Sequence, residues 1–125
     1  MKENSLSNLV IGAAIEVHRE MGPGLLESVY HQCLQHELAI RGVPYEVEVP
    51  IKAGYKQLDF DCAYRMDIVV NDSVVLELKV VEKLLPVHEA QLLSYLRLTG
   101  KRLGLLINFN APVLKAGIKR IVNGL

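Results

Sequence analysis

Hydrophobic residues along the chain follow two spacings, one with a period of three to four residues and one with a period of two. The first spacing is typical of helices that bury one face, and the second of strands that do so. Glycines at 22, 42 and 100 are expected to end the first three helices. The helical spacing predicts four helices, over about residues 6–21, 25–41, 86–99 and 112–123.

The alternating spacing predicts strands between the second and third helices. Residues 43–49 and 58–64 alternate strictly, and two short runs rich in Val, Ile and Leu flank the turn formers at 71–73. This order predicts an antiparallel meander of about four strands. Residues 103–108 are almost continuously apolar, as expected of a strand buried on both faces. Because this strand follows a strand and a helix, a βαβ crossover should place it parallel to residues 75–80.

The hairpin from Asp67 to Lys79 places charges next to a core. In an extended strand Glu77 and Lys79 share one face, while Leu76, Leu78 and Val80 take the other. A two-residue turn of Asn71-Asp72 would pair residue 67 with residue 76, whereas a three-residue turn would pair residue 67 with residue 77. Only the second register puts Asp67 beside Glu77.

That register brings two carboxylates together. Two ionised carboxylates about 5 Å apart near a protein surface repel each other by on the order of 3 kcal/mol, and like charges opposite each other destabilise a sheet. Lys79 can offset the repulsion as part of a structural salt-bridge cluster. A divalent cation held by carboxylate oxygens would offset it more fully and would create a catalytic centre.

Length predicts one domain over residues 1–125, and the meander followed by the crossover predicts an α/β fold with a mixed sheet of the α+β type. Half of the 125 residues are hydrophobic, which favours a globular chain. There is no apolar run of about 18 residues and no signal-peptide core, so we expect a cytoplasmic protein without a membrane partner. The two cysteines, Cys33 and Cys62, lack metal-ligand spacing and are expected to be reduced.

The net charge of zero conceals an asymmetry. Residues 1–89 hold 14 acids and 8 bases, a balance of −6, whereas residues 90–125 hold 6 bases and no acid. Six bases can neutralise phosphates if they converge on one face, and otherwise they form a solvated surface. The candidates for nucleic-acid contact are Arg97, Lys101, Arg102, Lys115 and Lys119, with Arg120 beside them.

Two of the predicted helices carry polar residues beside their apolar stripes. Glu27 can point along the edge of the core toward a site, or it can be a first-turn acid that complements the helix dipole. On the third helix His88, Gln91 and Tyr95 form one stripe, which either faces the Glu77–Lys79 surface or faces water.

Four motifs together resemble a known family. Asp67, nine further residues and Glu77-Leu78-Lys79 are similar to the signature of the PD-(D/E)xK nuclease superfamily, although Met66 stands where that signature has proline. Gln91 to Tyr95 is similar to the Gln-x-x-x-Tyr motif of several branches, and Gly24 to Tyr30 to the Gly-x-x-Glu-x-x-Tyr motif of the small GxxExxY family. The resemblance extends from about residue 11 to residue 123. It implies a restriction-endonuclease-like core: helix, antiparallel meander, crossover helix, strand and a final helix.

The resemblance also implies roles for individual residues. Asp67, Glu77 and the backbone carbonyl of Leu78 would hold Mg²⁺, with Mn²⁺ as the alternative, and Lys79 would orient the attacking water or stabilise the transition state. Glu27 would extend the metal site. Gln91 would brace the site or the phosphate, and Tyr95 would contact the phosphate or support the metal ligands.

The implied function is metal-dependent hydrolysis of phosphodiester bonds in nucleic acid, with DNA favoured over RNA. One alternative is a nuclease-fold protein that binds nucleic acid or a partner protein without cutting. Another is a structure-specific nuclease similar to the archaeal Holliday-junction resolvases. A chain this short offers little surface to grip DNA, so a homodimer or a larger complex is expected.

Overall fold

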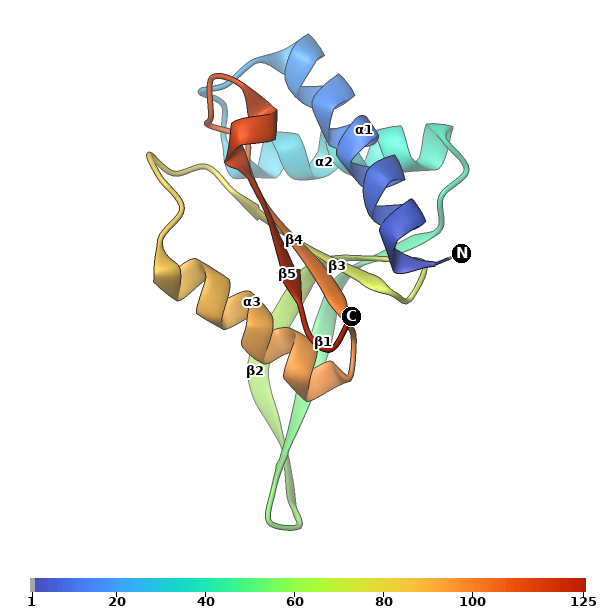
Figure 1. The fold of residues 1–125 in the computed structure, drawn as a ribbon, viewed down its shortest axis with the longest axis vertical. Coiled ribbons are helices and arrows are strands. Elements are labelled where there is room, and N and C mark those ends of the chain that lie inside the picture. Colours follow the sequence, from blue (N-terminus) through green and yellow to red (C-terminus); the bar gives the residue numbers. More distant parts are fainter. Residues whose placement is uncertain (1) are drawn as a thin grey trace.

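The computed structural model describes residues 2–125, which form one five-stranded sheet with helices on both faces (Figure 1). The strands lie in sequence order, β1-β2-β3-β4-β5, so β1 and β5 are the edges. The elements of this part of the chain are α1 (Glu3–Met21), α2 (Glu27–Ile40), β1 (Tyr45–Tyr55), β2 (Leu58–Val70), β3 (Val74–Lys79), α3 (Pro86–Thr99), β4 (Leu103–Asn108), a 3₁₀ turn (Leu114–Gly117) and β5 (Ile118–Val122).

The two faces of the sheet are covered by different helices. Helices α1 and α2 cover one face, and α3 crosses the other (Figure 1). Leu76 and Leu78 of β3 belong to the core under α1 and α2, whereas Val75 belongs to the core under α3. This alternation confirms the expected burial of β3 and leaves Glu77 on the face toward α3.

The meander has three strands rather than four. β2 runs without a break from Leu58 to Val70, because Met66 pairs with Val49 and Arg65 pairs with Pro50. The feature between the two expected strands is an irregularity in register, at which Ala63 has a φ of 62°. A bulge of this kind bends a strand without ending it.

The crossover is confirmed in full. α3 begins at Pro86 and ends before Gly100, whose φ of 71° is the left-handed conformation of a helix C-cap. The strand that follows, β4, is buried at every position and pairs parallel with β3 along its whole length, from Val74↔Leu103 to Lys79↔Asn108.

The predicted final helix over residues 112–123 is wrong. That segment forms the 3₁₀ turn and then β5, which pairs antiparallel with β4 from Ile107↔Ile118 to Leu103↔Val122. The open edge of β4 would otherwise leave a row of backbone groups unpaired in the core, and these pairs outweigh the helical spacing. Ile118 and Val122 are β-branched and suit the strand.

No helix within residues 2–125 is long and apolar enough to cross a membrane. Cys33 and Cys62 are both free thiols, as expected, and both are half-buried.

Candidate metal and catalytic site

The turn between β2 and β3 decides where the carboxylates lie. Val70 pairs with Val74 and Ile68 pairs with Leu76, so the turn has three residues and Asp67 lies opposite Glu77. Asn71 and Asp72 adopt left-handed backbone angles, with φ of 49° and 53°. Of the two registers that the sequence left open, the structure therefore has the one that brings the carboxylates together.

Asp67 lies where the two strands part. The backbone pairs between β2 and β3 stop at Ile68↔Leu76. Beyond that point the Asp67 side chain replaces the backbone pairing, because its Oδ2 accepts a hydrogen bond of 2.9 Å from the backbone N–H of Leu78. This bond fixes the carboxylate against the end of β3.

Glu77 is the buried member of the pair, with an exposed fraction of 5%. Burial, followed by its side-chain hydrogen bond with Asp67, raises the pKa of Glu77 to about 9. The nearby Lys79 lowers this pKa only in part. A proton on Glu77 is therefore one way to relieve the repulsion between the carboxylates, and a cation is another.

Glu27 reaches the same place from α2. Burial is the largest cause that raises its pKa, followed by the negative charge of Asp67, while the positive charge of Lys79 lowers it. Lys79 is half-buried at the end of β3. Glu27 is thus both the first residue of its helix and a neighbour of the Asp67–Lys79 surface.

Tyr30 fixes the start of α2 and thereby places Glu27. Its hydroxyl donates a hydrogen bond of 2.5 Å to the carbonyl of Gly22 and accepts one of 3.1 Å from the N–H of Leu25. Its ring stacks on Phe109, with the centroids 4.6 Å apart. In the Gly-x-x-Glu-x-x-Tyr motif, the tyrosine three residues after Glu27 therefore connects the loop before α2 to the core.

His31 and Glu48 also lie at the site, and sequence reasoning missed both. One ligand atom from each of His31, Glu48 and Asp67 lies within 4.8 Å of the other two. His31 is four residues after Glu27, so the two share a face of α2, a spacing that could have revealed it. Glu48 lies across from Asp67, because the pairs Val47↔Ile68 and Val49↔Met66 flank it.

The three polar residues of the α3 stripe, His88, Gln91 and Tyr95, have different surroundings. Tyr95 is buried, and burial, with the charge of Glu77 next, raises its pKa to about 12. Its ring packs on Tyr64 with the centroids 5.7 Å apart. Gln91 is exposed one turn earlier, and His88 accepts a hydrogen bond from the N–H of Leu85 at the start of the helix. Tyr95 therefore faces the carboxylates, whereas His88 caps the helix.

The basic residues of the last third are spread over the molecule. Lys101 and Arg102 precede β4 and Lys115 follows it, so they lie at opposite ends of that strand. Lys101 donates a 3.0 Å hydrogen bond to Asp72, and Nζ of Lys119 is 4.0 Å from Glu89. Arg102 donates to the carbonyl of Gly124, and Arg97 is exposed on α3.

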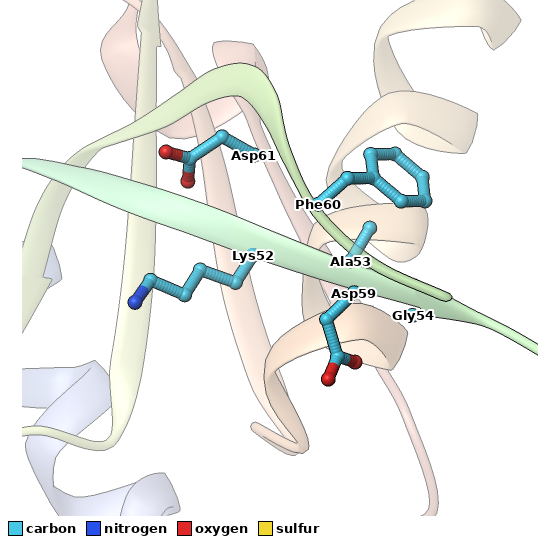
Figure 2. A pocket seen from close by; sticks show the side chains of 6 residues that line it. All are labelled: Lys52, Ala53, Gly54, Asp59, Phe60 and Asp61. Atoms are coloured by element: carbon cyan, nitrogen blue, oxygen red, sulfur yellow. The ribbon is translucent and has the colours of Figure 1, made fainter. Parts of the chain in front are cut away.

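A hollow of about 490 Å³ lies elsewhere, on the β1–β2 hairpin (Figure 2). Lys52, Asp59 and Asp61 line it together with Phe60. Lys52 pairs with Asp61 across the two strands, and Phe60 points away from Asp59. The hollow contains none of the residues grouped around Asp67, so we do not place the site there.

The donor set around Asp67 fits a divalent cation. It offers carboxylate oxygens and one imidazole, whose Nε2 is buried without a hydrogen-bond partner among residues 2–125. A buried polar atom that lacks a partner calls for an explanation, and a bound cation is one such explanation. The candidate ligands come from three elements, with His31 on α2, Glu48 on β1 and Asp67 on β2.

A mixed sheet between helices, with acidic residues and a lysine where two strands part, defines the restriction-endonuclease-like class of α/β proteins. The chain belongs to the PD-(D/E)XK nuclease superfamily, whose sequence profile matches residues 4–121. The proteins of this superfamily generally use divalent metals, which agrees with the donor set.

The fold is also similar to a solved structure, the crystal structure of SSO0001, with a TM-score of 0.59 and 23% sequence identity. The match covers 79% of this chain and 51% of that one, so this chain spans about half the length of its structural neighbour. At this identity the likeness shows the fold alone. No curated protein matches the chain.

Proposed function

We propose that residues 1–125 form one domain that hydrolyses phosphodiester bonds in nucleic acid with the help of a divalent cation. The observation that carries the proposal is the register that sets Asp67 opposite Glu77, with Lys79 on the same face of β3. Glu27 reaches this surface from α2. Membership of the superfamily supports nucleic acid as the substrate class.

Asp67, Glu77 and the carbonyl of Leu78 would hold the cation, for which Mg²⁺ suits the oxygen ligands. The cation supplies positive charge that activates water and stabilises the charge developing on the scissile phosphate. Lys79 would orient the attacking water or stabilise the pentavalent transition state. Glu27 would extend the ligand set or fix a water molecule.

The residues of α3 would act on the phosphate. Tyr95 would contact the phosphate or support the metal ligands, since it lies close enough to Glu77 for that charge to raise the pKa of its hydroxyl. Gln91, exposed one turn away, would brace the phosphate from outside. Among the five candidate bases, Arg97 and Lys115 are exposed and make no ion pair or side-chain hydrogen bond with residues 2–125, so we assign them the first phosphate contacts. The remaining candidates, Lys101, Arg102 and Lys119, have partners within the chain.

Four finer assignments rest on the sequence. The Gly-x-x-Glu-x-x-Tyr spacing supports membership of the GxxExxY family. DNA is the favoured substrate over RNA, and the small size of the chain supports a homodimer or a larger complex. A cytoplasmic location stays a prediction.

A second function has an observation in its favour. With a proton on Glu77 and the Leu78 N–H donated to Asp67, this pair of carboxyl groups is satisfied without a cation. A nuclease-fold protein that binds nucleic acid or a partner protein without cutting would keep such a network.

Cleavage assays separate the two functions. Lys79→Met should lower the rate of DNA cleavage in Mg²⁺ or Mn²⁺ by about 100-fold or more, because the reacting phosphate loses a positive charge. DNA binding by this variant, measured by fluorescence anisotropy, should persist. The matched control is Lys83→Met, which removes an exposed lysine after β3 and should keep the wild-type rate. Wild-type protein that binds DNA but does not cut it with either metal would favour the non-catalytic function.

A further inference from the structure

His31, Glu48 and Asp67 form a group of ligands that differs chemically from an all-oxygen site. One ligand atom of each lies within 4.8 Å of the others, and Nε2 of His31 is 3.8 Å from Oε1 of Glu48. That separation is too long for a hydrogen bond. Side-chain shifts of about 1 Å would bring such atoms to the bond lengths of about 2.0–2.2 Å that divalent ions make. The group shares Asp67 with the site above, so the inference rests on the proposed function.

The His31 ring is held as a metal ligand would be held. The Gln35 side-chain amide places its Nε2 at 2.7 Å from Nδ1 of His31, while Nε2 of the imidazole is buried and has no partner among residues 2–125. A half-turn of this amide exchanges its nitrogen for its oxygen, which would then accept a hydrogen bond from an N–H at Nδ1. That tautomer leaves a lone pair on Nε2, directed at the two carboxylates. Metal-bound histidines are typically oriented by such a bond to their other nitrogen.

The backbone of β1 gives Glu48 its place. Glu48 has a φ of 50°, which is uncommon for a residue with a side chain and is found in strained, functional positions. Regular pairs flank it on both sides, so the left-handed residue is a local departure within a formed strand. Its side chain is 59% exposed, so the carboxylate is free to move toward a cation.

An imidazole changes which cation a site prefers. Oxygen ligands suit Mg²⁺, whereas imidazole suits the later first-row transition ions, whose affinity rises in the order Mn²⁺, Fe²⁺, Co²⁺, Ni²⁺. We propose that His31 and Glu48, acting with Asp67, make this site select a first-row transition ion over Mg²⁺. Gln35 is then a positioning residue, because it acts through His31.

Calorimetric titration with Co²⁺, Mn²⁺ and Mg²⁺ in turn tests the proposal. Wild-type protein should bind Co²⁺ more tightly than Mn²⁺ and Mn²⁺ more tightly than Mg²⁺, with Co²⁺ and Mg²⁺ separated by about 100-fold. His31→Gln should weaken Co²⁺ binding by about tenfold or more while changing Mg²⁺ binding by less than about threefold. The difference in affinity between Co²⁺ and Mg²⁺ should therefore be smaller in this variant. Gln35→Leu should weaken Co²⁺ binding in the same direction by about tenfold.

His36→Gln is the matched control, because His36 is exposed on the same helix and should leave all three affinities unchanged. A spectroscopic readout is independent of affinity. Pulsed electron paramagnetic resonance of the Mn²⁺-loaded protein should show coupling to an imidazole nitrogen in the wild type and in His36→Gln, and none in His31→Gln. Glu48→Gln serves as a second variant if His31→Gln does not fold, and it should also weaken Co²⁺ binding.

Two results would overturn the proposal in distinguishable ways. If Asp67→Asn abolishes metal binding but His31→Gln leaves the series and the nitrogen coupling unchanged, the selection by His31 is wrong and the proposed function stands. If no ion binds the wild type, or binding survives Asp67→Asn, the metal site of the proposed function fails and this inference fails with it.

Discussion

At the scale of single residues, the ionisation of Glu77 links the candidate site to the stability of the fold. Its folded pKa of about 9 lies above its ordinary value of 4.5, so the folded state binds more protons than the unfolded state between these values. The stabilisation is fully present below pH 4.5 and is lost as the pH rises through 9. The free energy of unfolding without added metal should therefore fall by on the order of a few kcal/mol across this window.

Urea denaturation at pH 5, 6, 7, 8 and 9 in the presence of a chelator measures this dependence. Glu77→Gln keeps the shape of the side chain but cannot ionise, so its unfolding free energy should change much less with pH. Glu82→Gln removes an exposed acid outside the site and should keep the wild-type dependence. Equal slopes for Glu77→Gln and the wild type would contradict the assignment of the shift to Glu77.

The same scale shows what the sequence could and could not predict of the site. Alternation along β3 and the turn formers at 71–73 reduced the position of Asp67 to two registers, one of which is present. His31 and Glu48 escaped prediction for different reasons. The spacing from Glu27 puts His31 on the same face of α2, but its approach to Asp67 depends on how α2 packs against the sheet. The position of Glu48 depends on a left-handed backbone conformation that no local sequence pattern predicts.

At the scale of elements, the largest difference between expectation and structure is β5. Isoleucines and valines at 118, 121 and 122 fit a helical face as well as a strand, so local spacing did not decide between them. The edge of β4 decided, because a strand there pairs backbone groups that a helix would leave unpaired. By contrast, α3 was predictable to the residue, since Pro86 and Gly100 mark its two ends.

Gly117 makes the strand possible, and its replacement tests this. A Cβ added there would lie 2.7 Å from the carbonyl oxygen of Asn108 and 2.8 Å from Cβ of Ala111. Gly117→Ala should therefore destabilise the fold by about 1–3 kcal/mol through overpacking. Gly12→Ala is the contrast, because a Cβ there meets only the flexible end of Arg41, at 3.3 Å, and alanine favours a helix.

Thermal and urea unfolding of the two alanine variants give the comparison. Gly12→Ala should be neutral or stabilise the fold by up to about 1 kcal/mol. If Gly117→Ala is as stable as the wild type, the close approach of the 3₁₀ turn to the end of β4 is wrong. That approach matters to the site, because Asn108 pairs with Lys79 across the sheet.

At the scale of the whole molecule, the fold redistributes the charge asymmetry of the sequence. Residues 90–125 carry six bases and no acid, yet folding places these bases at both ends of β4, on the edge strand β5 and on the outside of α3. Lys101 and Lys119 face acids from the first part of the chain, Asp72 and Glu89. Part of the positive charge is therefore paired with acidic residues within the molecule, and the five candidates do not form a single basic face.

This distribution predicts a weak dependence of DNA binding on salt. A protein that contacts several phosphates loses affinity with a slope of about −0.9 per phosphate in a plot of log K against log salt concentration. Arg97 and Lys115, which have no partner among residues 2–125, and Lys79 at the site would give a slope of about −2 to −3, rather than about −5. Fluorescence anisotropy with a labelled duplex, in chelator and at several NaCl concentrations, measures it.

A matched pair of variants locates the contacts. Lys115→Ala should make the slope shallower by about one unit, because it removes an exposed base beside the end of β4 that carries the site. Lys101→Ala should leave the slope unchanged, since that ammonium already pairs with Asp72 at 3.0 Å at the far end of the strand. A wild-type slope near −5, with equal effects of the two variants, would mean that all the bases converge on DNA. A second copy of the chain would then be needed to complete the basic surface, because one copy does not present it.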